Sequence, residues 1–339
     1  MKNVSLRDIA EELGVSKTLV SLVLNGKAKE NRISQEVIDK VARLAKEKGY
    51  EPNQFAKALR TGKSKTIGLV VADIANPFFS KMARSIEDHA NNTEYTVLFG
   101  SSDEDYKKAD KLVKAMIDRQ IEGLIISPTL GGMQNIELLH KFQVPYVLVD
   151  RPFPEIRSNF VGVDNFEASF HAVSKLIAEG RKNIAHITFN NELSHMNQRL
   201  DGYLKAHEKH GLSIDDSLIK YVSNDHASDE ILAFISGISS RVDAFFFANN
   251  EIGLVALKCL QQLGKKINGE LAITCFDDHD AFHLLNSSIN VIIQPVADIG
   301  KEALKLLFDQ IESKKELNRQ IILPTSYQTL NEYLLKKQS

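Results

Sequence analysis

The sequence predicts an α/β protein with a small all-α segment at its N-terminus, followed by a larger core of two α/β lobes. Three observations lead to this class. Two short amphipathic helices joined by a tight turn open the chain, apolar β-rich runs alternate with helical stretches from Thr66 onward, and this alternation occurs in two successive blocks. A chain of 339 residues, of which 43% are hydrophobic, is long enough for more than one domain.

The first helix is expected from Ser5 to Leu13. Ser5 and Asp8 have the spacing of a capping box, in which a hydroxyl and a carboxylate bind the free backbone N–H groups of the first turn. Gly14 should end the helix, because glycine most easily adopts the left-handed conformation that follows a last turn. The apolar face comprises Leu6, Ile9, Ala10 and Leu13.

The second helix is expected from Ser16, which can cap it, to Leu24, with Gly26 closing it. Val20, Val23 and Leu24 form its buried face, whereas Lys17, Thr18, Ser21 and Leu22 face outward. A third amphipathic helix, capped by Ser34 and ending at Gly49, would complete a three-helix core. The first two helices have the spacing of a helix-turn-helix, although a hairpin that merely packs on another part of the protein would show the same pattern.

Charge favours the DNA-binding interpretation of these helices. From Met1 to Lys65 the chain has 14 Lys and Arg against 8 Asp and Glu, a net charge of +6, whereas the whole chain carries −2. A basic N-terminal segment on an acidic body is typical of a protein that binds nucleic acid phosphates.

Eight short stretches spread along the chain follow one known pattern. They are Leu6 to Ala10, Gly14 to Lys17, Val23 to Gly26, Tyr50 to Gly62, Thr66 to Val70, Asp73 to Phe79, Val161 to Asp164 and Phe276 to Asp278. In this order they resemble the LacI/GalR family of bacterial transcriptional regulators, and the resemblance covers essentially the whole chain. It implies a helix-turn-helix headpiece and a core like a periplasmic binding protein, with parallel sheets and three crossovers between the lobes.

The resemblance also implies a division into domains. Residues 1–51 would be the headpiece, 52–65 a hinge helix and linker, and 66–339 an effector-binding core. Within the core, the N-lobe would comprise about 66–162 and 292–324, and the C-lobe about 163–291 and 325–339.

Carried over by position, the resemblance assigns DNA contacts to the second helix and its ends. Base reading falls to Lys17, Thr18, Ser21 and Leu22, and backbone contacts fall to Ser5, Ser16 and Asn25. Leu22 stands where the family often has Arg, a change that removes a contact worth about 1–3 kcal/mol of base discrimination but still allows contact with a thymine methyl. The loop from Lys27 to Ile33 is also longer than the common form, so the operator should differ from the usual one.

The hinge is expected to order on DNA. Its helix, from Asn53 to Arg60, is far shorter than the roughly 12–15 residues at which an isolated helix becomes marginal in water. Asn53 is a further expected DNA contact, and the resemblance implies that Leu59 wedges into the minor groove beside the same residue of a second copy. The alternative is a flexible linker with an incidental leucine.

Strands and helices of the core are expected in two series. The first contains strands at Ile67–Val71, Tyr95–Phe99, Leu124–Ser127 and Tyr146–Asp150 and helices near Phe79–Asn91, Ala109–Arg119 and Asn135–Lys141. The second contains strands near Ile184–Phe189, Ile219–Val222, Ala244–Phe247 and Ile273–Phe276 and helices near Phe166–Glu179, Gln198–Lys209, Ile231–Ser236 and Ile252–Leu263. Such alternation is typical of parallel sheets with crossover helices.

Ligands of open α/β sheets bind beyond the carboxyl ends of the strands, where Asp150, Asn249 and Asp277 stand. The resemblance adds Arg199 and Gln294 as polar effector contacts and Phe78 and Phe79 as an apolar floor. Carboxylates, amides and a guanidinium bind hydroxyls, and aromatic faces cover C–H surfaces, so a sugar or sugar derivative is the expected effector. Asp150 and Asn249 could instead be loop caps, and the two phenylalanines could be core.

One departure concerns the charge of this cleft. Asn250 occupies a place where the family commonly has Asp.

An enzyme is the weaker interpretation. The acidic and imidazole-rich segment from Asp277 to His283 matches no metal-binding spacing, and the chain has neither a Walker motif nor a G-x-G-x-x-G. No catalytic residue, metal or cofactor is therefore expected. The only two cysteines, Cys259 and Cys275, are expected to be small buried hydrophobes.

No apolar run is long enough to span a membrane and no signal peptide is evident, so a cytoplasmic protein is expected.

The expected function is a sequence-specific DNA-binding repressor that binds a pseudo-palindromic operator as a homodimer and responds to a small polar effector. Twofold pairing is expected because one small headpiece reads few bases. The segment from Asn331 to Lys337 is too short for the added heptads of a helical tetramer. A sugar-binding receptor or sugar-acting enzyme with a basic appendix is the alternative, and the sequence leaves open whether the effector is an inducer or a corepressor.

Overall fold

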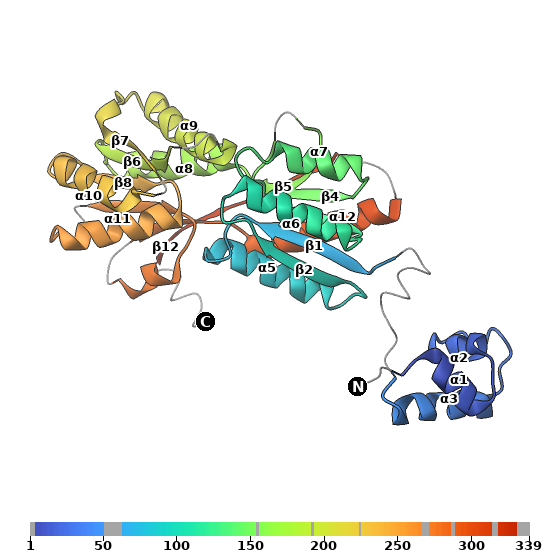
Figure 1. The fold of residues 1–339 in the computed structure, drawn as a ribbon. Helices are drawn as coiled ribbons and strands as arrows, with labels where there is room; N and C mark the ends of the chain where they lie inside the picture. The colour runs from blue at the N-terminus through green and yellow to red at the C-terminus, as the bar shows by residue number, and fades with distance from the viewer. Residues whose placement is uncertain are drawn as a thin grey trace. The chain divides into compact units, whose positions relative to one another are not determined.

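The computed structural model describes residues 4–50, 63–153, 156–190, 193–223, 225–265, 271–285, 289–313 and 318–330. It divides into two compact units, Met1–Ser64 and Lys65–Ser339. Figure 1 shows the three-helix unit and the larger α/β unit.

The first unit consists of α1 (Leu6–Leu13), α2 (Lys17–Leu24) and α3 (Gln35–Glu47). Ser5 and Asp8 form the expected capping box, and Gly14 ends α1 in the left-handed conformation at φ 64°. Ser16 caps α2 by accepting a hydrogen bond from Leu19 N at 3.1 Å. Ser34 is the N-cap residue of α3, as predicted, but its side chain makes no capping hydrogen bond. The buried core contains Ile9, Ala10, Val20, Val23, Ala28, Val41, Leu44 and Ala45.

The second unit contains two six-stranded sheets, each at the centre of one lobe. In the first sheet the order is β11 (Gln320–Leu323), β5 (Asn159–Val163), β4 (Tyr146–Val149), β3 (Gly123–Ile126), β1 (Thr66–Val71) and β2 (Thr96–Ser101). All of its pairings are parallel. Alternate residues of its strands serve two packed layers, so Leu69 packs with α5 (Pro77–Ala90) and α12 (Val296–Ser313), whereas Val70 packs with α6 (Tyr106–Asp118) and α7 (Met133–Lys141).

The second sheet has the order β12 (Ser326–Thr329), β10 (Ile289–Ile293), β9 (Ala272–Phe276), β8 (Ala244–Phe247), β6 (Ile184–Phe189) and β7 (Ile219–Val222). Its pairings are parallel except that β12 runs antiparallel to β10. On one face lie α8 (Asn165–Ala178) and α9 (Ser194–Lys209), and on the other α10 (Ala227–Ile238) and α11 (Asn250–Gln262). Gly202 lets α9 approach the backbone of α8, because a Cβ there would lie 2.4 Å from Phe166 O.

The chain crosses three times between the two sheets. It leaves the first sheet after β5, returns to it between β10 and α12, and leaves again between β11 and β12. This confirms the predicted fold class of a three-helix headpiece with a two-lobed α/β core, parallel sheets and three crossovers (Figure 1).

Among the α-helices and strands of the described residues, five were not predicted from the sequence: β5, β10, α12, β11 and β12. Strands β11 and β12 lie at sheet edges and are half-exposed, so they lack a buried apolar run. Helix boundaries also moved, most for α10, which spans 12 residues and begins at Ala227. Among the described residues, no helix combines the length and apolar character needed to cross a bilayer.

Candidate functional site

Helix α2 carries the four side chains predicted to read bases. Lys17 and Thr18 are exposed on the first turn of α2, and Ser21 and Leu22 are half-buried one turn later. Leu22 is not among the apolar side chains packed on the three-helix core, and it remains accessible. The structure brings these four positions together on one helix, which is the arrangement required to read successive base pairs.

The residues predicted to contact the DNA backbone also hold the ends of these helices. Ser5 Oγ donates to Asp8 Oδ2 at 2.8 Å, and Ser16 caps α2. Asn25 Nδ2 donates to Ser21 O at 2.6 Å. Helix N-termini present unpaired N–H groups, which suit phosphate oxygens.

The long loop between α2 and α3 is folded against the core. Ala28 is 5% exposed and belongs to the buried cluster, and Ile33 N donates to Ala28 O at 3.0 Å. Lys27, Lys29 and Arg32 are exposed on this loop. The predicted contacts at Asn53 and Leu59 lie outside the described residues, as does the whole predicted hinge helix.

A cavity of about 440 Å³ lies in the core, within the range usual for small-molecule sites. Its lining includes six of the seven predicted effector residues: Phe78, Phe79, Asp150, Arg199, Asn249 and Asp277. They come from α5 and the end of β4 in the first lobe and from α9, α11 and the end of β9 in the second. Both lobes therefore contribute to one site.

Asp150 and Asp277 occupy equivalent positions in the two lobes. Each directly follows a buried strand and has a left-handed backbone, with φ 68° and 69°. Such a conformation is uncommon for a residue other than glycine, although Asp tolerates it better than most. Burial raises the pKa of Asp150 to about 6 and also raises that of Asp277, while neighbouring guanidinium groups act in the opposite direction. Two strained, buried carboxylates facing one cavity are typical of a ligand site.

Arg199 projects from α9 and is only 2% exposed. Its Nε donates to Asn165 Oδ1 at 2.9 Å and its Nη1 donates to Ala248 O at 2.7 Å. Nη1 also lies 3.6 Å from Asp277 Oδ2, and the guanidinium stacks 3.5 Å above the ring of Phe276. Burial lowers the pKa of Arg199, although an arginine with these partners remains charged.

Gln294 does not line the cavity among the described residues. Its Nε2 donates to Asp277 Oδ1 at 2.7 Å, so it contacts a carboxylate that lines the cavity and helps to fix the position of that carboxylate. Asn249 caps α11 by accepting a hydrogen bond from Ile252 N at 2.9 Å, and it also faces the cavity. Phe78 and Phe79 were expected to form either the apolar floor of the site or part of the core. They do both, since they line the cavity and belong to the core.

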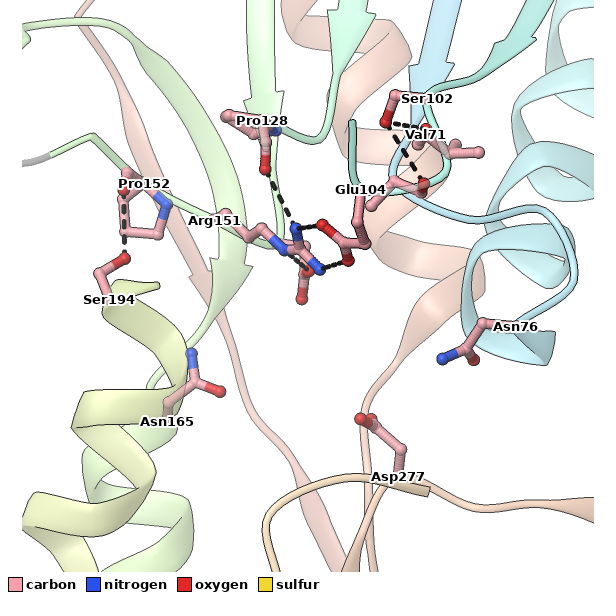
Figure 2. Close-up of polar contacts among 12 residues, drawn as sticks. Val71, Asn76, Ser102, Glu104, Pro128, Arg151, Pro152, Asn165, Ser194 and Asp277 are labelled. Atoms are coloured by element: carbon pink, nitrogen blue, oxygen red, sulfur yellow. Dashed lines mark hydrogen bonds and ion pairs between the residues drawn. The ribbon is translucent and has the colours of Figure 1, made fainter. Parts of the chain in front are cut away.

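Sequence reasoning missed Arg151, which forms a bidentate ion pair with Glu104 at 2.7 and 2.6 Å (Figure 2). Its Nη1 also donates to Pro128 O at 3.2 Å. Its position directly after Asp150, at the end of the same strand, was the sequence feature that could have identified it. Burial opposes the charge of Arg151, but the neighbouring carboxylates prevail and raise its pKa.

His195 and Asn76 were also missed. His195 is 3% exposed and lines the cavity, and its Nδ1 has no hydrogen-bond partner within the described part of the chain. Asn76 caps α5 and exchanges two hydrogen bonds with Asn250 of the other lobe, at 3.1 and 3.3 Å. Neither residue has a sequence pattern that identifies its role, because each role depends on residues of the other lobe.

The acidic and imidazole-rich segment near Asp277 forms local contacts. His283 Nε2 lies 2.9 Å from Asp278 Oδ1, and His279 Nδ1 accepts a hydrogen bond from Ala281 N at 3.0 Å. Across the described ranges, no group of three or more His, Cys, Asp or Glu could hold a metal ion. Cys259 and Cys275 are free and buried.

Comparison with known proteins identifies the protein family that each unit matches. The family model for bacterial regulatory proteins of the lacI family matches residues 5–53, and the model for periplasmic binding proteins and the sugar-binding domain of the LacI family matches residues 64–332. The chain belongs to the LacI family. It is a DNA-binding transcriptional regulator with a sugar-binding type of effector domain.

Individual relatives resemble this LacI-family chain over nearly its full length. Catabolite control protein A of Priestia megaterium is 30% identical, with 90% of this chain and 92% of the relative covered. The ribose operon repressor of Haemophilus influenzae is 29% identical, with 98% and 99% covered. A crystal structure of a LacI family transcriptional regulator from Enterococcus faecium with bound ribose superimposes with a TM-score of 0.68 at 25% identity, covering 78% of this chain and 96% of that one.

Proposed function

We propose that this regulator is a homodimeric repressor whose affinity for a pseudo-palindromic operator changes when a monosaccharide binds between its core lobes. The observation that supports this most directly is a cavity lined by polar groups from both lobes. A ligand held by two lobes favours one relative arrangement of them, and a ligand shifts an equilibrium by its differential affinity for the two states.

The proposed DNA contacts are those on α2 and at the helix ends. Lys17, Thr18, Ser21 and Leu22 would read bases, while Ser5, Ser16 and Asn25 would bind phosphates. Asn53 and Leu59 would contact the duplex from the hinge. The domain division is 1–51, 52–65 and 66–339. Sheet membership supports lobe boundaries near residues 163, 294 and 325. The second boundary differs slightly from the one predicted between residues 291 and 292, because β10, a strand of the second sheet, extends to Ile293.

The proposed ligand contacts combine acceptors, donors and apolar surface. Asp150 and Asp277 would accept hydrogen bonds from sugar hydroxyls, Asn249 would donate or accept, Arg199 would donate to a ligand oxygen, and Phe78 and Phe79 would cover the C–H face of the ring. Gln294 would act through Asp277, which it holds in place. The relative from Enterococcus faecium contains bound ribose, so D-ribose is the first ligand to test.

DNA binding is tested by a gel shift with the fragment upstream of the chain's own gene. A discrete complex is expected, with a log affinity that falls linearly with log salt concentration. Lys17→Ala should weaken this complex, whereas Lys111→Ala, which removes an exposed charge from α6 of the core, should not. Failure to bind any such fragment, or equal effects of the two substitutions, would contradict the proposal.

Effector binding is tested by calorimetry and thermal shift with D-ribose and a panel of neutral monosaccharides. A neutral sugar should bind the wild type, and Asp277→Asn should weaken that binding more than Asp118→Asn, which changes an exposed carboxylate on α6. The same sugar should alter the gel-shift affinity in one direction or the other. A sugar that binds without any effect on DNA affinity would contradict the regulatory part of the proposal.

A cytoplasmic location belongs to the same proposal, because an operator-binding regulator acts where the chromosome is.

A further inference from the structure

The cavity has an excess of negative charge. Its lining contains seven carboxylates, Asp73, Asp103, Glu104, Asp150, Asp225, Glu251 and Asp277, and two guanidinium groups, Arg151 and Arg199. Within the described residues, no lysine lines it. An excess of one sign of charge in a cleft lowers the local concentration of ions of the same sign.

Both guanidinium groups are already engaged by the protein. The two terminal nitrogens of Arg151 bind Glu104, as Figure 2 shows, and its Nε lies 3.3 Å from Asp150 Oδ2. Arg199 Nε and Nη1 both donate to protein oxygens, and Asp277 lies 3.6 Å away. Recognition of a phosphate or carboxylate is strongest when two parallel N–H groups of one guanidinium are available. Both terminal nitrogens of Arg151 are occupied by Glu104, and a bidentate contact through Nε of Arg199 would break its bond to Asn165.

Three of the remaining carboxylates are not balanced by these arginines. Asp103 pairs with Lys108, but Asp73, which is half-buried, and Asp225 and Glu251, which are exposed at the cavity, add their charge to it. Burial raises the pKa of Glu251, and the charges of Asp73 and Glu104 raise it further. The carboxylates of the wall therefore repel one another, and an incoming anion would meet the same repulsion.

His195 does not add a compensating positive charge. Burial holds the pKa of His195 well below its usual value, and the nearby charges of Arg151 and Arg199 lower it further. The ring is therefore neutral at physiological pH and can both donate and accept a hydrogen bond. A neutral imidazole matches a hydroxyl, which has the same dual character.

We infer that the cleft accepts an uncharged polyhydroxylated ligand and rejects phosphorylated and carboxylated sugars, with Asp73, Asp225 and Glu251 excluding anions and His195 serving as a hydroxyl partner. This inference rests on the proposed function, because it assigns the ligand class of the same site. It distinguishes a regulator that senses a free sugar from one that senses the phosphorylated sugar produced by a kinase or by phosphorylating uptake.

The test compares neutral sugars with their phosphates by calorimetry on the full chain. The probes are D-ribose with D-ribose 5-phosphate and D-glucose with D-glucose 6-phosphate. For each neutral sugar that binds, the phosphate should bind at least about tenfold more weakly at low ionic strength, because like charges brought together at an interface oppose binding. The difference should narrow as salt is added, since screening weakens the repulsion.

A pair of charge-neutralising variants identifies the source of the discrimination. Asp225→Asn/Glu251→Gln should reduce the ratio of the two dissociation constants severalfold. Asp118→Asn/Glu137→Gln changes the net charge of the chain equally at exposed positions on α6 and α7, and should leave the ratio unchanged. Equal ratios in the two double variants would overturn the role given to the acidic wall.

The imidazole is tested with His195→Phe and His195→Gln. The amide of glutamine restores a donor and an acceptor, so His195→Gln should keep more of the neutral-sugar affinity than His195→Phe. A circular dichroism melt of both variants checks that the fold is retained. Equal affinities of the two variants would contradict the hydroxyl-partner role.

The two levels of the proposal fail in different ways. Tighter binding of a phosphate than of its parent sugar would overturn the inference and leave an effector site in place. Absence of binding by every member of both pairs and of the neutral-sugar panel would contradict the proposed function itself.

Discussion

Protonation of Asp150 should control the affinity of the core for its sugar. This carboxyl is 6% exposed, and burial raises its pKa to about 6. The charges of Arg151 and Arg199 oppose that rise, whereas those of Asp277 and Glu104 add to it. The group therefore titrates close to physiological pH.

The stability of the ligand-free protein gives the first magnitude. The difference between a pKa of about 6 in the folded protein and 3.8 in an unfolded chain corresponds to about 3 kcal/mol. Between these values the folded state binds more protons than the unfolded state, so the contribution of Asp150 to stability is fully present below pH 3.8 and is lost as the pH rises through about 6. Asp150→Asn should flatten this part of the stability profile measured by urea unfolding.

Ligand affinity should change in the opposite direction. The ionised carboxylate accepts hydrogen bonds from sugar hydroxyls, and bonds to charged groups contribute about 1.5–3 kcal/mol against about 0.5–1.5 kcal/mol for neutral ones. Protonation should therefore weaken the binding of a neutral sugar in the cavity about tenfold between pH 7.5 and pH 5. His195 does not titrate in this window, because its pKa lies well below the usual value.

Calorimetric titration of the neutral monosaccharide that binds the wild type, repeated at half-unit pH intervals, measures this dependence, with Asp150→Asn as the variant that cannot ionise. Wild-type affinity should change most steeply near pH 6. Asp150→Asn should lose that part of the change and keep only a contribution from Asp277, whose pKa burial also raises. A constant affinity in the wild type, or an unchanged slope in Asp150→Asn, would refute the assignment to Asp150.

Three further substitutions test packing and contacts. Gly202→Ala should lower the free energy of unfolding by about 3 kcal/mol, because the new Cβ would lie 2.4 Å from a backbone oxygen of α8; urea unfolding measures it. Asn250→Ala removes both hydrogen bonds to Asn76, at 3.1 and 3.3 Å, and should weaken contact between the lobes by about 1–2 kcal/mol, seen as a larger radius of gyration in small-angle X-ray scattering. Ser16→Ala removes the cap of α2 and should cost about 1 kcal/mol, seen as faster hydrogen exchange at the start of that helix.

Matched controls separate these effects from nonspecific changes. Gly237 is at an exposed position of α10, and a Cβ added there would have nothing within 4 Å. Gly237→Ala should therefore raise the free energy of unfolding by up to about 1 kcal/mol. Ser34→Ala should have little effect on α3, since this serine makes no capping hydrogen bond. Equal destabilisation by the two glycine substitutions, unchanged scattering for Asn250→Ala, or equal exchange effects for the two serine substitutions would contradict the corresponding contact.

Local signals were sufficient to predict much of the fold. Ser5, Asp8 and Gly14 define α1 through hydrogen bonds within one or two turns, and the apolar runs of β1 and β8 are buried on both faces. Strands β11 and β12 could not be predicted in this way. Their pairing depends on partners more than 30 residues away, and their side chains remain half-exposed.

The cavity shows the same division between local and distant causes. Asp150 and Asp277 could be predicted because polar residues after buried strands meet at one edge of a sheet. Gln294 was placed near the correct carboxylate, but the structure inserts Asp277 between it and the cavity. His195 and Asn76 acquire their surroundings only when the two lobes approach each other, which no local pattern encodes.

The last crossing between the lobes has a consequence for biosynthesis. Strands β11 and β12 complete the outer edges of the two sheets, and only Pro324 and Thr325 separate them in the chain. Until the ribosome has released this short stretch, β5 and β10 are unpaired edge strands of their sheets, and their side chains are mostly apolar and buried in the finished fold. An unpaired edge strand of this kind can pair with a strand of another chain. A nascent chain stalled shortly before residue 320 should therefore aggregate or recruit chaperones, and synthesis beyond residue 329 should relieve both edges together.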